Sequence, residues 1–223
     1  MLLRPIDTPP RGWSSVPRPL TDTTVSTADG ITISYFGLRF EVPWKGIDKE
    51  RNQRCTFEVV FKSRQAMRLG NPDCLDLSPI SSYTSHLNQD DLRLAFGTVV
   101  RESKYDQYKA VISTTPSQLS PFLSHREFAR TRVLLEIKGL WFEHTPEVPD
   151  IFSFATKEYR GFQINTASEE GQTVVLELFD RTDRYWFTMR IVGRGAMLTQ
   201  PEINRLINSF GTESSSSLTH SRK

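Results

Sequence analysis

Residues 173–192 read TVVLELFDRTDRYWFTMRIV, and this stretch decides the fold class. Two runs rich in β-branched and aromatic residues flank the short link Arg181–Asp183. A link this short predicts a hairpin, so we expect antiparallel neighbouring strands at Thr173–Asp180 and Arg184–Val192. In the second run, Tyr185, Phe187, Met189 and Ile191 line one face, and Trp186, Thr188 and Arg190 line the other.

Further strands are predicted on both sides of this hairpin. Apolar residues alternate with polar ones at 31–35, 38–42 and 56–62, with Gly37 as a turn residue and Pro43 ending the second strand. Two more extended runs precede the hairpin, at 151–156 and 160–165. Most of the predicted strands therefore lie near the two ends of the folded body.

Helices are expected in the middle and at the end of the chain. Ser103 with Asp106 resembles a capping pair for a helix that Pro116 terminates, and a shorter helix is expected at 90–96. A long helix runs from the N-cap Ser124 to about Phe142, with apolar residues on most of its surface, and is expected to pack on two sides. The last helix begins with the capping box TQPE at 199–202, and Gly211 is expected as its C-cap.

Strands, then helices, then strands predict an α+β fold, with an antiparallel β-sheet packed against helices. We expect a single domain at 30–211 with an enlarged helical insertion at about 84–145. A Pro-rich arm at 1–29 is expected to be extended or disordered, and a Ser-rich tail at 212–223 disordered.

The composition limits the class of protein. The chain has 223 residues and a formal net charge of +2, which is not the strongly basic balance of a dedicated nucleic-acid binder. No run reaches the ~18 apolar residues of a membrane span, and the start MLLRPIDTPPRGW lacks the apolar core of a signal peptide. We therefore expect a cytoplasmic protein without nucleic acid or a membrane span, or an exported one if its true start lies upstream.

The two cysteines lie nineteen residues apart, at Cys55 and Cys74, outside any CxxC pattern. The favoured interpretation is a pair of ordinary thiols in a reducing compartment; the alternative is one disulfide in an exported protein. Cys74 is a poor nucleophile candidate because Asp73 and Asp76 raise a thiol pKa. The four histidines are scattered, so no zinc site and no other cofactor is expected.

The two ends of the folded body resemble those of PsbP-like domains, which include photosystem II extrinsic subunits and bacterial relatives. The resemblance rests on GITISYFGLRFEVPW at the start and on the final hairpin followed by TQPEINRLINSF, and it covers about 31–62 and 151–210. It implies an accessory or binding role rather than catalysis, and it carries no site residue onto this chain.

Motifs of catalysis or phosphate binding are not found. Gly193-Arg194-Gly195 could cradle an anion but is typical of a plain turn, and Asp90-Asp91 is typical of a helix start rather than of an acid–base pair. Ser124-His125 and Glu143-His144 bracket the long helix without selecting a nucleophile. No catalytic residue is therefore predicted.

One candidate interaction surface emerges from the charge pattern. From Arg39 to Arg68 there are eight basic and four acidic residues, whereas 70–91 holds four acidic residues and no basic one. The candidate surface comprises Trp44, Lys45, Arg51 and Arg54, where an aromatic side chain among cations could meet an acidic partner. The competing interpretation is a solvated hairpin loop.

Three functions remain in order of preference. The first is a non-catalytic accessory or binding domain that acts through protein–protein contacts. The second is a small-molecule or lipid-binding protein with a pocket between the long helix and the sheet. The third is an enzyme whose site assembles from distant residues.

Overall fold

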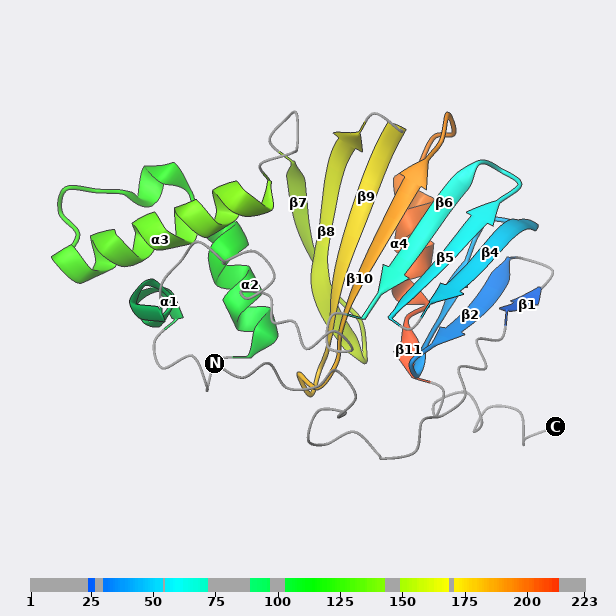
Figure 1. Ribbon diagram of the computed structural model, residues 1–223, viewed down its shortest axis with the longest axis horizontal. Coiled ribbons are helices and arrows are strands. Elements are labelled where there is room, and N and C mark those ends of the chain that lie inside the picture. The colour runs from blue at the N-terminus through cyan, green and yellow to red at the C-terminus, as the bar shows by residue number, and fades with distance from the viewer. Residues whose placement is uncertain are drawn as a thin grey trace.

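In Figure 1 a large twisted sheet occupies the middle of the computed structural model, with three helices at one end and a small sheet at the other. The structure describes residues 24–26, 30–53, 55–71, 89–96, 103–142, 149–168 and 171–212. The large sheet has seven strands, and every pair of neighbours is antiparallel. In spatial order they are β4 (Ile47–Gln53), β5 (Thr56–Phe61), β6 (Gln65–Gly70), β10 (Trp186–Gly193), β9 (Gly171–Asp180), β8 (Tyr159–Ser168) and β7 (Asp150–Ala155).

The small sheet contains four strands, also antiparallel. They are β1 (Thr24–Ser26), β2 (Ile31–Tyr35), β3 (Leu38–Val42) and β11 (Gly211–Thr212). The β2–β3 turn places Phe36 and Gly37 at positive φ. The α+β prediction with a largely antiparallel sheet is therefore confirmed.

One face of the seven-stranded sheet, here called the core face, packs against the small sheet and the last helix α4 (Gln200–Asn208). Alternate residues of four of its strands enter this core: Phe57, Val59, Phe61, Met67, Leu69, Val174, Leu176, Leu178, Phe187, Met189 and Ile191. Helix α4 adds Ile203, Leu206 and Ile207, and its capping box is formed, with Thr199 N donating to Glu202 Oε2 at 3.1 Å.

Among the described residues, helices cover only part of the opposite, outer face of the seven-stranded sheet. Helix α2 (Lys104–Ser113) and the C-terminal end of α3 (His125–Trp141) pack on this face, and α1 (Gln89–Phe96) packs on the other helices. The short 3₁₀ helix η2 (Pro116–Gln118) follows α2 in the chain. Helices α1, α2 and α3 share a small apolar core, which includes Phe96, Val111 and Ile137. The predicted helical middle of the chain is therefore present.

Aromatic side chains join α2 to the sheet. Tyr108 stacks on Trp141 at 4.5 Å between ring centroids and on Phe162 at 5.5 Å. Behind it, Phe179 stacks on Trp186 at 6.0 Å. We name the part of the outer face that these rings cover the aromatic half. Long helix α3 therefore packs mainly on other helices, and only its C-terminal end reaches the aromatic cluster at the sheet.

The N-terminus of α2 is fixed by a turn of the sheet. Asp183, in the β9–β10 turn at φ 57°, accepts from the backbone N–H of Lys104 at 2.8 Å and of Tyr105 at 3.4 Å. A carboxylate in this position satisfies free N–H groups and complements the helix dipole. Arg160 lies 4.0 Å above the Tyr105 ring, so a cation–π contact supports the same junction.

The structure corrects several details of the sequence predictions. Gly211 is not a helix cap: Ser209 holds that position, and Gly211 pairs with Arg39 in the small sheet. Residues 24–26 of the expected arm form a strand, and β4 and β6 were not predicted. Within the described ranges, no helix is long and apolar enough to cross a bilayer.

Candidate functional site

The structure separates the four residues of the predicted interaction surface. Trp44 is wrong as a surface residue: it is only 3% exposed, and its ring packs 5.4 Å from that of Phe61. It is buried because the chain after β3 and Pro43 turns its side chain into the core between the two sheets. Lys45 and Arg51 are exposed at opposite ends of the segment that contains β4, and Arg54 lies outside the described residues.

Arg51 instead belongs to a row of charges that crosses four strands of the outer face. The strand register places Arg51 opposite Glu58, Glu58 opposite Arg68, and Arg68 opposite Arg190. Since directly opposed residues share one face of a sheet, all four side chains point away from the core. We name the exposed cations Lys49, Arg51, Arg68 and Arg190 the basic half of the outer face.

Two arginines in this row stand directly opposite each other. The Cβ atoms of opposed residues in an antiparallel pair lie about 5 Å apart, so Arg68 and Arg190 hold two positive charges side by side. Like charges in this arrangement destabilise a sheet. Arg68 and Arg190 are both exposed, so water screens the repulsion, but folding does not explain the pairing.

The four cations of the basic half form no ion pair within the described part of the chain, although Glu58 stands opposite Arg51 and Arg68. The one ion pair between described residues lies in α1, where Arg93 pairs with Asp90 at 3.5 Å. Arg51 donates from Nη2 and Nε to the side-chain oxygen of Gln53, at 2.7 and 3.0 Å, once the Gln53 amide takes its hydrogen-bonding orientation. This neutral partner leaves the charge of the guanidinium in place, so the basic half suits an anion.

A buried glutamate marks the boundary between the two halves. Glu177 Oε2 accepts from Trp186 Nε1 at 2.6 Å and from Thr188 Oγ1 at 2.8 Å. Burial raises the pKa of the Glu177 carboxyl to about 7, although the two hydrogen bonds oppose this shift. In the folded chain the Glu177 carboxyl therefore holds its proton through the acidic pH range, up to about pH 7.

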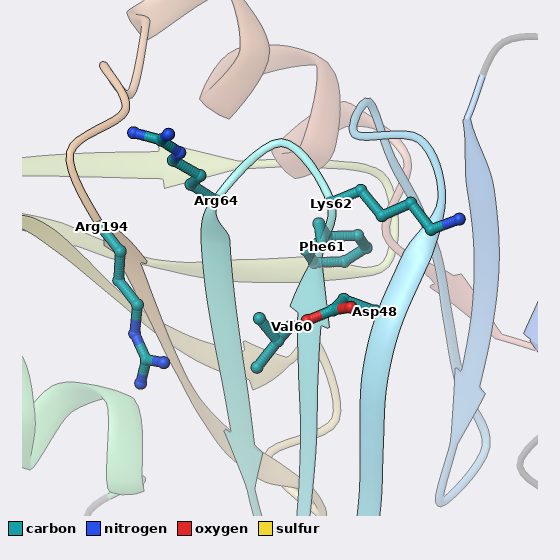
Figure 2. Close-up of a pocket in the computed structure, with 6 residues that line it drawn as sticks. All are labelled: Asp48, Val60, Phe61, Lys62, Arg64 and Arg194. Carbon is teal, nitrogen blue, oxygen red and sulfur yellow. The ribbon is translucent and has the colours of Figure 1, made fainter.

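A shallow pocket of about 390 Å³ lies at the end of β5 nearest the β5–β6 turn. Its lining residues are Asp48, Val60, Phe61, Lys62, Arg64 and Arg194. In Figure 2 Asp48 points toward Val60, whereas Lys62 and Arg64 extend away from the middle. The cations do not converge on one point, so this pocket extends the positive charge of the outer face without forming an enclosed site.

The motif at 193–195 forms a tight turn, which was the favoured interpretation of it. Gly193 ends β10, and a Cβ there would lie 2.2 Å from the Ala196 carbonyl oxygen, so the tight turn requires glycine. Arg194 N donates to the Arg64 carbonyl at 3.0 Å, which joins two loops at the pocket. Residues 193–195 thus form a turn whose central residue, Arg194, lines the pocket.

The other residue pairs considered for catalysis have structural roles where they are described. Asp90 and Asp91 lie in the first turn of α1, and Ser124 caps α3 in a capping box with Glu127. His125 is exposed at the start of α3, and Glu143-His144 lies outside the described residues. Over the ranges that the structure describes, no three His, Cys, Asp or Glu side chains are grouped to hold a metal.

The favoured interpretation of the cysteines is wrong. Cys55 is disulfide-bonded, and Cys74 is the other cysteine of the chain. The spacing alone did not distinguish a disulfide from two thiols, because nineteen residues are compatible with both. Cys55 itself is buried at the start of β5, where its carbonyl accepts from Asn71 N at 3.1 Å.

The position proposed for a small-molecule pocket is occupied by protein. Helix α2 lies between α3 and the sheet, and Tyr105, Tyr108 and Trp141 fill the space with stacked rings. Among the apolar residues at the end of α3, Leu134 is buried, and Leu140, Trp141 and the adjoining Phe142 are half-buried.

Arg68 and Arg190 are the residues that sequence reasoning did not bring together. They lie in different thirds of the chain, and only the pairing of β6 with β10 makes them neighbours. Each strand did carry a local signal that its arginine faces away from the core, because an arginine stands between two apolar residues. Arg68 lies between Met67 and Leu69, and Arg190 lies between Met189 and Ile191. The chain matches no protein-family model and no curated protein, so these comparisons do not support the PsbP-like resemblance.

Proposed function

We propose that this chain is a non-catalytic binding domain that contacts an acidic segment of a partner protein through the basic half of its outer face. The observation that carries the proposal is the exposed pair Arg68 and Arg190, opposed across two strands. A carboxylate between two guanidinium groups accepts charge-assisted hydrogen bonds from both and removes their repulsion. The accessory role implied by the PsbP-like resemblance agrees with this proposal.

A protein partner is favoured over nucleic acid by the extent and composition of the surface. The basic half has four cations, with Glu58 among them, and the whole chain carries only +2. A nucleic-acid surface would combine a longer basic track with exposed aromatic rings for stacking. The one aromatic residue expected there, Trp44, is buried.

The test measures binding of two defined polyanions to the full chain. Fluorescence anisotropy compares a labelled polyglutamate peptide with a labelled DNA duplex, at low and at physiological salt. The wild-type chain should prefer polyglutamate, and the double variant Arg68→Glu/Arg190→Glu should weaken this binding at least about tenfold, because it reverses two charges in the contact. The matched control is Lys109→Glu/Lys157→Glu, which reverses two exposed cations elsewhere.

Two results would overturn the proposal. Equal binding of polyglutamate by the wild type and by the Arg68/Arg190 variant would remove the basic half from the contact. A preference for the duplex that depends on the same two arginines would assign the surface to nucleic acid. Thermal melting of each variant confirms that the fold is retained in either case.

The disulfide of Cys55 leads us to propose that the chain functions in an oxidising compartment, where such bonds persist. Alkylation of the protein as isolated from its cells, followed by mass spectrometry, should modify neither cysteine until a reductant is added. Immediate alkylation of both would contradict this proposal. The Cys55→Ser variant should lower the free energy of unfolding by about 2–4 kcal/mol.

A further inference from the structure

The loop between η2 and α3 carries the most exposed aromatic residue among those described. Phe122 is 95% exposed, and Phe128, in the first turns of α3, is 42% exposed. Figure 1 places this loop and the start of α3 at the end of the molecule farthest from the small sheet. Phe122 therefore projects from a protruding end of the protein, and Phe128 is partly exposed in the helix that follows.

Local hydrogen bonds hold this loop in place. Phe122 N donates to Ser120 Oγ at 3.3 Å, and Leu123 N donates to the Ser120 carbonyl at 3.2 Å. Directly after it, Ser124 N donates to Glu127 Oε2 at 3.0 Å in the capping box of α3. Phe122 is thus exposed on a turn that hydrogen bonds hold in a defined conformation.

Positive charge accompanies the two rings along the chain. From Thr115 to Arg132 the sequence contains three arginines and one carboxylate, that of Glu127, which is engaged in the capping box. His125, Phe128 and Arg132 follow one another at helical spacing, so they share one exposed strip of α3. We name Phe122, His125, Arg126, Phe128 and Arg132 the aromatic tip.

We propose that the aromatic tip docks on the surface of an anionic lipid bilayer. Exposed aromatic rings gain free energy at the boundary between headgroups and acyl chains, and neighbouring arginines are attracted to anionic headgroups. The positive charge around a projecting apolar tip is complementary to such a surface. This contact lies apart from the basic half of the sheet, so it is independent of the function proposed above.

The test is co-sedimentation of the full chain with vesicles. One set contains equal parts of phosphatidylcholine and phosphatidylglycerol, and the other contains phosphatidylcholine alone. The wild type should bind the anionic vesicles, and Phe122→Ser/Phe128→Ser should weaken this binding at least about tenfold. Arg126→Glu/Arg132→Glu should weaken it by at least about fivefold per residue and should remove the preference for anionic lipid.

Two control variants isolate the tip. Phe152→Ser removes a ring that is 52% exposed on β7, and Lys109→Glu/Lys157→Glu reverses two exposed charges outside the tip and outside the basic half; neither should weaken binding by more than about twofold. Phe122→Trp should show a blue-shifted emission component only with anionic vesicles. Failure of the wild type to bind these vesicles, or binding unaffected by the double serine variant, would overturn the proposal. A tip that binds a protein groove would give the first of these results.

Discussion

The outer face of the seven-stranded sheet is divided into an aromatic half and a basic half, and strand β10 contributes to both. Trp186, at the start of β10, stacks under the helices, whereas Arg190, four residues later on the same face, is exposed. On this face, β10 is therefore buried at its start and exposed to solvent further along. The side chains of the strand match the helix cover: the ring lies where the helices pack, and the arginine lies where solvent reaches the sheet.

The largest expected effect comes from the aromatic half. Phe179→Ala should lower the free energy of unfolding by about 3–5 kcal/mol, because it leaves a cavity among fully buried rings. Urea denaturation followed by circular dichroism measures the change. The control on the other half, Arg190→Ala, should change stability by no more than about 0.5 kcal/mol. Similar losses in the two variants would contradict the division of the face.

The boundary between the halves should respond to pH. Because burial raises the pKa of Glu177 to about 7, the folded state holds a proton that the unfolded state has released above about pH 4.5. Stability should therefore fall by roughly 3 kcal/mol as the pH rises from about 4.5 to about 7, and then level off. Glu177→Gln, which keeps a hydrogen-bond acceptor, should remove this dependence in urea titrations across that range. An unchanged slope would exclude Glu177 as its source.

The junction between the helices and the sheet depends on Asp183. Asp183→Gly tolerates the positive φ but removes the carboxylate, so α2 should lose about 1–2 kcal/mol of stability. Hydrogen exchange should speed up in α2 and stay unchanged in β5 and β6. Asp183→Asn retains an acceptor and is the matched control, which should show a smaller change. Equal acceleration over the whole chain would show that the contact is not local to the junction.

The smallest effect concerns the basic half. Arg190→Glu would place a carboxylate opposite Arg68, and the new pair should raise the free energy of unfolding by about 0.2–1 kcal/mol. The same substitution should weaken polyglutamate binding, so stability and binding would change in opposite directions. Thermal melting at low salt detects the gain. A loss of stability would show that Arg68 and Arg190 do not repel each other in the folded chain.

Much of the fold could be predicted from local pattern. The β2–β3 hairpin, the strands from β7 to β10 and the helices carry clear alternation, apolar stripes or caps, and each is found close to its expected range. Strand β4 could not be predicted because it is an edge strand: six of its seven residues are exposed, so no alternation marks it. Strand β6 was missed because its first three residues, Gln65, Ala66 and Met67, are all buried, so its sequence does not alternate regularly between apolar and polar residues.

The candidate site was less accessible to sequence reasoning. Charge density along the chain indicated the region of Arg51, and the structure confirms that this side chain is exposed. The same reasoning failed for Trp44, since proximity to cations in sequence does not decide burial. Arg68 and Arg190 required the register of β6 against β10, which depends on contacts distant in sequence and has no local signature.

The contact between Asp183 and α2 also has a consequence for the order in which the molecule is made. The carboxylate that caps Lys104 follows it by 79 residues along the chain. At about 5–20 residues per second, a ribosome needs roughly 4–16 seconds to add that length. By the end of this interval α1, α2 and α3 have been synthesised, but the turn that fixes α2 has only just been added and β10, which helps to cover the aromatic side of the helices, has not. Newly made chains therefore present Tyr105, Tyr108 and Trp141 to chaperones and to one another until the second half of the sheet arrives.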